Sequence, residues 1–184
     1  MSNTVPQEDK ERLQIEYLRS ALHYYITARF ATINALIPLA GNLAHHAVEL
    51  YLKAALVKTT DEKERRQLKH HLPKIWERYK AQVTSPELNE FDRTIADLDK
   101  FEGIRYPERI LTLGMTLEAG FVRNPEPTQH AGMPRYELIL DELDGLVKLI
   151  FQISKLNPAF FMSMLHKPDA KQYLNEQNRT PWNI

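Results

Sequence analysis

Three polar side chains stand one helical turn apart within an otherwise apolar segment. His45, Glu49 and Lys53 occupy positions i, i+4 and i+8, so a helix would align them on one stripe beside its apolar face. A His and a Glu at this spacing can hold a divalent metal, but the pattern offers no third ligand with matching context. A solvated ladder of helix pairs is the alternative. We therefore expect neither a bound metal nor a cofactor.

Basic residues gather shortly after this stripe. His70 and His71 stand where another helix is expected to begin, a place where imidazoles more often cap or pack than act as bases. The surrounding segment 63–80 contains a run of cations: Lys63, Arg65, Arg66, Lys69, Lys74, Arg78 and Lys80. Such a patch can contact RNA phosphates or an acidic protein. Neither a Gly-rich loop nor interleaved aromatics accompany it, which favours a solvated face, with Trp76 in the core.

Apolar periodicity predicts the helices that position these residues. Apolar side chains recur at three- and four-residue steps, which predicts helices over residues 10–36, 43–57, 72–83, 88–98 and 134–153, and a short last helix over 157–165. Pro38 is expected to end the first helix. The polar residues 166–184 are expected to run over the surface as a C-terminal tail.

One segment departs from the helical period. Apolar residues alternate strictly from Leu111 to Leu117, which is the period of a strand. An isolated strand is marginal, so this segment must fold back as a hairpin or pair with another copy of the chain. The fold class predicted is all-α, with about five to six helices and one short extended or β-hairpin segment near 110–118.

Composition limits the class of protein. The 184 residues carry 24 Lys and Arg against 24 Asp and Glu, and there is no cysteine. We expect one helical domain over residues 1–165, because this length supplies a sizeable core without disulfides or Cys-bound zinc. The N-terminal segment is polar, and no apolar run reaches the roughly twenty residues of a membrane span. We expect a soluble, cytoplasmic protein that does not enter a membrane.

Three short segments resemble HEPN-type domains. Residues Leu43–Leu56 (LAHHAVELYLKAAL) are similar to the core helix of that family, whose pattern runs His-Ala, Glu-Leu and Leu-Lys-Ala. His70–Leu72, followed by Ile75, is similar to the family's His-Asp-Leu stretch, although His71 stands where an Asp is usual. Phe101–Pro107 resembles an Arg-Tyr-Pro segment that closes the following helix.

The resemblance implies an up-and-down helical bundle, usually dimeric. The family contains ribonucleases, partners of nucleotidyltransferases and members without known activity. By the same resemblance, the candidate ligand-binding residues are His46, Glu49, Lys53, His70, Arg105 and Tyr106. Glu49 and Arg105 would then be partly buried, and Arg105 would lie near Lys53 and His70 and help to bind an anionic group. The structural alternative is that Gly103 and Pro107 end a helix whose last carbonyls bond Arg105.

The resemblance also suggests a catalytic set. Nuclease members use an Arg followed by a polar residue and, shortly after, a His, and Arg123, Asn124 and His130 meet that description. His130 would act as general base or acid on a ribose 2′-hydroxyl, while Arg123 would neutralise charge on the phosphate without a metal. Pro125 and Pro127 separate the two residues, which predicts a loop ahead of the helix expected from Pro134.

These observations favour a non-catalytic or regulatory binding module of HEPN type with an unknown ligand. The system it serves is expected to be related to nucleotides, RNA or defence. The expected partners are a second copy of the chain, RNA, a nucleotide or a nucleotidyltransferase-like protein. A metal-independent ribonuclease using Arg123 and His130 is the alternative function, and a purely structural interaction protein is a third.

Overall fold

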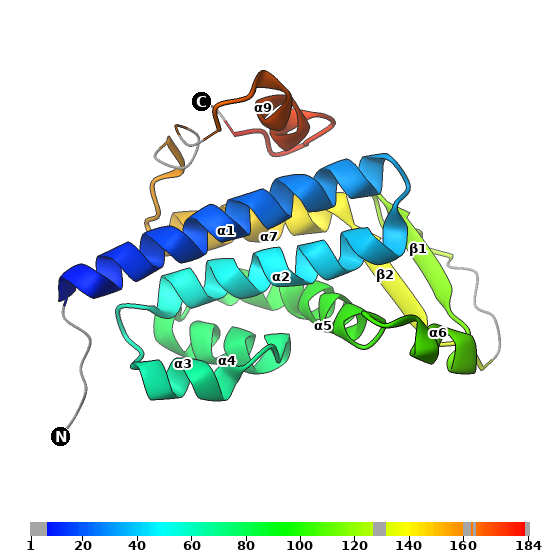
Figure 1. Cartoon of the computed structure of the whole chain (residues 1–184), viewed down its shortest axis with the longest axis horizontal. Coiled ribbons are helices and arrows are strands. Elements are labelled where there is room, and N and C mark those ends of the chain that lie inside the picture. The colour runs from blue at the N-terminus through cyan, green and yellow to red at the C-terminus, as the bar shows by residue number, and fades with distance from the viewer. Residues whose placement is uncertain (1–6, 127–131, 160–162, 164, 183–184) are drawn as a thin grey trace.

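The computed structural model describes residues 7–126, 132–159, 163 and 165–182 (Figure 1). In chain order the elements are α1 (Gln7–Ile33), α2 (Ile37–Leu56), α3 (Glu62–Leu68), α4 (Leu72–Val83), the 3-10 helix η1 (Pro86–Phe91), α5 (Asp92–Glu102), α6 (Pro107–Leu113), β1 (Thr116–Gly120), β2 (Arg135–Ile139), α7 (Leu140–Ile153) and α9 (Pro168–Asn175). The helical fold class with one short extended segment is confirmed. Within these residues, no helix combines the length and hydropathy that a membrane crossing requires.

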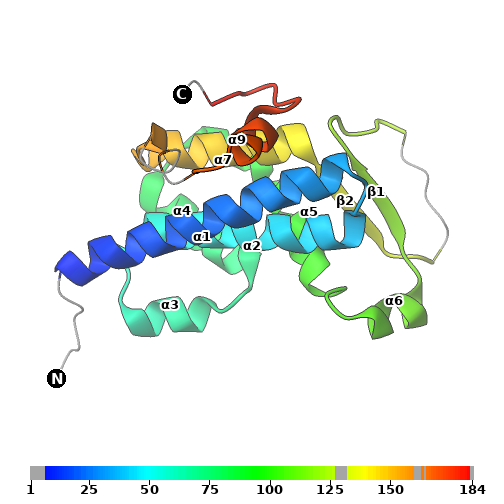
Figure 2. The same cartoon turned by 45° about the horizontal axis from the view of Figure 1, so that its top comes forward.

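Helices α1 and α2 lie side by side over most of their length, and α2 is the central element (Figures 1 and 2). It contacts α1, α4, α5 and α7, so most of its surface is buried. The tight α1–α2 turn places Ala35 at φ 59°, and α2 begins at Ile37 rather than at Leu43 as expected. Pro38 stands in the first turn of α2, where its missing N–H costs no hydrogen bond.

Gly41 lies inside α2 because α5 approaches the helix closely there. An ideal Cβ at Gly41 would lie 2.0 Å from Cδ1 of the buried Phe101. The absence of a side chain therefore lets the Phe101 ring pack on the α2 backbone. This contact fixes the C-terminal end of α5 against the first turns of α2, near the closed end of the hairpin formed by α1 and α2.

The strand-like segment is present but shifted along the chain. Residues 111–113 belong to α6, and β1 pairs in parallel with β2, from Thr116 opposite Arg135 to Gly120 opposite Ile139. The sheet is therefore not a hairpin. The helix expected from Pro134 was wrong over 135–139, because this segment is strand β2 and α7 begins at Leu140. In this segment Tyr136 and Leu138 alternate with polar residues, which is the period of a strand. This short alternation was missed in the sequence because apolar residues at helical spacing extend over 134–153.

The segment expected as a polar tail includes α9, which packs against α1. Leu174 of α9 is buried in the core. The buried guanidinium of Arg29 on α1 donates from Nε to the carbonyl oxygen of Tyr173 at 2.9 Å and from Nη2 to that of Glu176. Of the short helix expected over 157–165, residues 158–159 are helical, while 160–162 and 164 lie outside the described residues.

Candidate functional site

The most concentrated group of titratable side chains surrounds a buried carboxylate on α2. Glu49 is 2 % exposed and sits between charged or titratable neighbours from its own helix and from the turn after α3. We call this group the Glu49 cluster, and its members are His45, His46, Glu49, Lys53 and His70. Helical spacing brings the first four together, because residues three or four apart share one face.

The distances within the Glu49 cluster separate close bonds from looser contacts. Lys53 Nζ donates to Glu49 Oε1 at 2.6 Å, and His70 Nδ1 lies 3.1 Å from both carboxylate oxygens. The other two imidazoles are farther away, with His45 Nε2 at 3.7 Å and His46 Nδ1 at 3.6 Å from Glu49 Oε2. One carboxylate oxygen is therefore held by Lys53, and the other faces histidines.

Lys53 also fixes the turn that carries His70. Its ammonium donates to the carbonyl oxygen of Lys69 at 2.7 Å, and Lys69 ends α3 with φ at 47°. A positive φ is unusual for a residue with a side chain, so the bond from Lys53 helps to hold this turn. The result is that His70 is held next to Glu49 although the two residues lie on different elements.

Electrostatics strongly favour the ionised carboxylate. Burial acts to raise the pKa of Glu49, but the neighbouring side chains of His45, His46 and Lys53 together outweigh it and hold the pKa well below its usual range. Burial of His45 acts to lower its pKa, while the Glu49 carboxylate raises it by more, so the net pKa is raised. The expected burial of Glu49 is confirmed and the alternative of a solvated helix ladder is excluded, because α2 is covered by neighbouring helices at this point.

An open cleft adjoins the exposed side of His70. Its volume is about 810 Å³, and we call it the basic cleft. It is lined by Lys69, His70, His71, Lys100, Arg109 and Arg135, against the acidic residues Asp99 and Glu102. Within the described residues, the side chains of Lys69, His71 and Arg109 have no hydrogen-bond or ion-pair partner. Lys69 and Arg109 are therefore available to an anion, and the His71 imidazole is free to donate a hydrogen bond to it.

Most of the basic segment 63–80 outside the basic cleft is neutralised. Arg66 pairs with Glu62 at 2.5 Å, and Arg78 pairs with Glu64 at 2.6 Å. Arg65 is buried and donates to the carbonyl oxygen of Thr60 at 2.6 Å. Most of the cations of this segment that lie outside the basic cleft therefore already have a partner within the protein.

Arg105 and Tyr106 do not join the Glu49 cluster. The expected burial of Arg105 was wrong, since its side chain is 47 % exposed and its ion pair, at 3.5 Å, is with Glu102. Tyr106 is 68 % exposed and precedes the first turn of α6. Both residues lie in the turn between α5 and α6, and neither lines the basic cleft, although Gly103 and Arg109 on either side of them do.

Arg123 lies in the loop after β1, as expected, but its guanidinium is fully engaged. Nε and Nη2 donate to the two oxygens of Glu142 at 2.7 Å each. Nη1 donates to Glu137 Oε2 at 2.6 Å and to Asp97 Oδ2 at 3.0 Å. The contact with Glu142 is bidentate, which is the strongest arrangement of this pair. Arg123 thus joins β2, α5 and α7.

The charges of this ion network stabilise one another. The hydrogen bonds that Arg123 donates to Glu142 raise the pKa of Arg123 above its usual range, although burial opposes this. Burial also acts to raise the pKa of Glu142, but the hydrogen bonds from Arg123 and Thr94 and the positive charge of Arg123 together with that of Arg93 lower it by more. Asn124 accepts a hydrogen bond from the Glu126 backbone at 3.0 Å and so shapes the loop. His130 lies outside the described residues.

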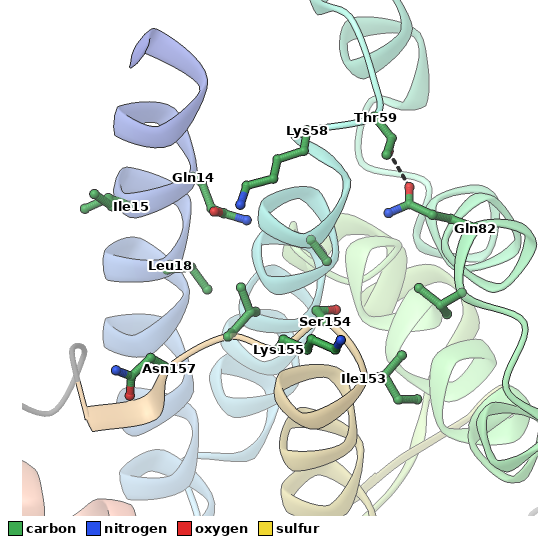
Figure 3. A pocket seen from close by; sticks show the side chains of 13 residues that line it. Gln14, Ile15, Leu18, Lys58, Thr59, Gln82, Ile153, Ser154, Lys155 and Asn157 are labelled. Carbon is green, nitrogen blue, oxygen red and sulfur yellow. Dashed lines mark hydrogen bonds between the residues drawn. The ribbon is translucent and has the colours of Figure 1, made fainter. Parts of the chain in front are cut away.

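A separate pocket of about 540 Å³ opens between the ends of α1, α2, α4 and α7 (Figure 3). Leu18 and Ile153 contribute to its apolar floor, while Lys58 extends toward Gln14 at the rim. The described side chains that line it include no carboxylate and no histidine. We therefore assign no acid–base chemistry to this pocket.

Sequence spacing identified His45, Glu49 and Lys53, and the family resemblance added His46 and His70, but neither indicated much of the basic cleft. Lys100, Arg109 and Arg135 come from α5, α6 and β2, so no local pattern connects them. The same holds for the three carboxylates around Arg123. One sequence signal could have located part of the cleft. The alternation of apolar and polar residues around Tyr136 predicts a strand, and pairing of that strand with β1 would have placed Arg135 beside it.

Comparison with known proteins identifies the family. The sequence model of the HEPN domain matches residues 15–117, from α1 into β1, which includes the Glu49 cluster. No curated protein and no solved structure matched the chain. The match spans more than half of the chain and agrees with the helical fold, so the protein belongs to the HEPN domain family.

Proposed function

We propose that this protein is a non-catalytic HEPN binding module that takes a phosphate-bearing ligand, a nucleotide or an RNA phosphate, in the basic cleft. The observation that carries the proposal is the engagement of Arg123 by three carboxylates. A guanidinium that neutralises a phosphate needs N–H groups directed at it. In this chain all three nitrogens of Arg123 already donate to carboxylates.

The surroundings of Arg123 also disfavour a phosphate. Asp97, Glu137 and Glu142 would repel a phosphodiester, and releasing Arg123 would leave mostly buried carboxylates without their partner. The ribonuclease alternative therefore requires the ion network to open. The basic cleft needs no such rearrangement, because the described part of the chain offers Lys69, His71 and Arg109 no internal partner.

The size and shape of the basic cleft support a nucleotide-sized ligand. A volume of about 810 Å³ falls within the usual range for small-molecule sites. Its cations come from several elements, so they surround a ligand instead of lying along one helix. His70 connects the cleft to the Glu49 cluster, which holds that imidazole in place.

We expect the protein to bind labelled RNA and a fluorescent ATP analogue while leaving the RNA intact. The double variant Lys69→Ala/Arg109→Ala should weaken binding at least about tenfold at low salt and reduce the salt dependence by roughly one to two phosphate contacts. Fluorescence anisotropy measures affinity, and gel electrophoresis with chelator present measures cleavage. Arg19→Ala, which removes a cation elsewhere on the surface, is the matched control.

The two arms of this experiment separate the possible outcomes. Binding that is equal in the double variant and in Arg19→Ala contradicts the basic cleft as the site. Chelator-resistant cleavage that disappears in both Arg123→Ala and His130→Ala would establish the ribonuclease instead. The folded state of each variant is checked by circular dichroism.

We also propose that the chain forms a homodimer through its exposed apolar end. Leu36 and Leu39 at the α1–α2 corner and Leu111 on α6 are 48 %, 55 % and 84 % exposed, and these elements lie at the same end of the molecule (Figures 1 and 2). Exposed apolar groups gathered in one region favour association. HEPN domains commonly form dimers, which agrees with this surface.

Light scattering at micromolar concentration should give twice the chain mass of 21.5 kDa. Leu111→Glu should shift the distribution toward the monomer, because it places a charge in the apolar surface. Gln152→Glu adds the same charge at an exposed position on α7 and should leave the mass unchanged. A monomeric wild-type protein would rule out the dimer.

A further inference from the structure

We propose, against the expectation from the sequence, that His45, His46 and Glu49 form a binding site for a divalent transition metal such as Zn²⁺. The proposal rests on observations separate from those behind the proposed nucleotide function. One ligand atom from each residue lies within 4.8 Å of the others. The i, i+4 pattern lacked a third ligand, and His46 supplies it.

The tautomer of His45 points to a cation. His45 is fully buried, and its Nδ1 lies 3.2 Å from the carbonyl oxygen of Leu98, which can only accept a hydrogen bond. In the neutral imidazole Nδ1 therefore carries the proton, and the lone pair of Nε2 faces the Glu49 carboxylate. Among the described residues, Nε2 has no hydrogen-bond partner. Two buried acceptors that face each other are unfavourable until a cation lies between them.

This arrangement also matches the support that metal ligands receive in proteins. A metal-binding imidazole usually donates its other N–H to a carbonyl or carboxylate, as His45 does to Leu98. A metal-binding carboxylate is usually held by a further hydrogen bond, as Lys53 holds Glu49 Oε1 at 2.6 Å. The second oxygen, Oε2, is left facing the two histidines.

The spacing requires little movement to accept the ion. Ligand atoms of a tetrahedral zinc site, about 2.0–2.2 Å from the metal, are separated by roughly 3.3–3.6 Å. Glu49 Oε2 lies 3.7 Å from His45 Nε2 and 3.6 Å from His46 Nδ1. The fourth position falls to a water, which can approach beside His70 because that side chain is 62 % exposed. Imidazole and carboxylate ligands suit zinc, cobalt and nickel.

Titration of tag-free, chelator-stripped protein with Co²⁺ tests the site. We expect one Co²⁺ per chain, visible absorption bands of tetrahedral Co²⁺, and displacement by one equivalent of Zn²⁺. His46→Ala and Glu49→Gln should each weaken binding by at least about tenfold. His23→Ala removes an exposed histidine of α1 and should bind as the wild type does.

A wild-type titration without these bands would overturn the site, as would equal binding in the wild type and both ligand variants. The same holds if His23→Ala weakens binding as much as His46→Ala does, since surface histidines would then be the ligands. His46 is partly exposed, so its replacement keeps the test valid even if Glu49→Gln does not fold.

Discussion

Replacing Glu49 by Ala should lower the free energy of unfolding by about 3–5 kcal/mol, which is typical for the loss of one partner of a buried ion pair. Lys53 is only 8 % exposed, and its ammonium would keep a single backbone carbonyl as its partner. His45 is buried beside it and would lose the neighbouring negative charge. Glu49 is thus the counter-ion of a buried basic group.

Urea unfolding in the presence of chelator measures this effect, so that metal binding does not contribute. Glu16→Ala is the control, because Glu16 forms an ion pair with Arg19 at the surface and should cost less than about 1 kcal/mol. Equal unfolding curves for Glu49→Ala and the wild type would show that the Glu49 cluster is solvated and not buried.

The pH dependence of this stabilisation has a defined sign. The folded-state pKa of Glu49 lies below the usual value of 4.5, so the unfolded chain binds a proton more readily. The contribution of Glu49 is therefore complete above about pH 4.5 and is lost as pH falls toward the folded-state pKa. The stability difference between the wild type and Glu49→Ala should shrink in acid.

The α2 segment shows what local sequence can predict and where it stops. Helical spacing placed His45, Glu49 and Lys53 on one stripe, and this is confirmed. Their burial was not predictable from spacing, because the same pattern on an exposed helix gives a solvated ladder. Burial here follows from helices α4, α5 and α7, which pack on α2 from distant parts of the chain.

Arg123 illustrates the opposite case, in which the residue was identified but its role was not. The sequence placed it correctly in a loop, and its partners come from α5, β2 and α7. Part of this environment depends on the strand 135–139. This strand was missed in the sequence because one helix was predicted over 134–153. Contacts between distant elements decide whether a basic residue binds a ligand or a carboxylate, and no local period encodes them.

The second large effect is expected at the ion pair that joins α1, α7 and the C-terminal segment. Arg29 and Asp144 are both buried, and Arg29 also donates to the backbone oxygens of Tyr173 and Glu176. Tyr25, which is fully buried, donates its hydroxyl to Asp144. Arg29 is therefore the link between the helical core and α9.

Asp144→Leu should lower the free energy of unfolding by about 3–5 kcal/mol, since it leaves the guanidinium of Arg29 and the hydroxyl of Tyr25 buried without their acceptor. The triple variant Arg29→Met/Asp144→Leu/Tyr25→Phe removes all the orphaned groups together. It should recover most of this loss, because apolar side chains of similar volume often replace a buried ion pair at little cost.

The triple variant should not restore the attachment of α9, because a methionine side chain in place of Arg29 offers no donor to the carbonyls of Tyr173 and Glu176. Hydrogen exchange of the α9 amides should therefore be faster in the triple variant than in the wild type, while exchange in α2 should be similar in the two proteins. Urea unfolding and hydrogen exchange measured on the same samples separate the two roles of Arg29. Slow exchange of α9 in the recovered triple variant would show that Leu174 and its apolar contacts, rather than Arg29, hold this helix to the core.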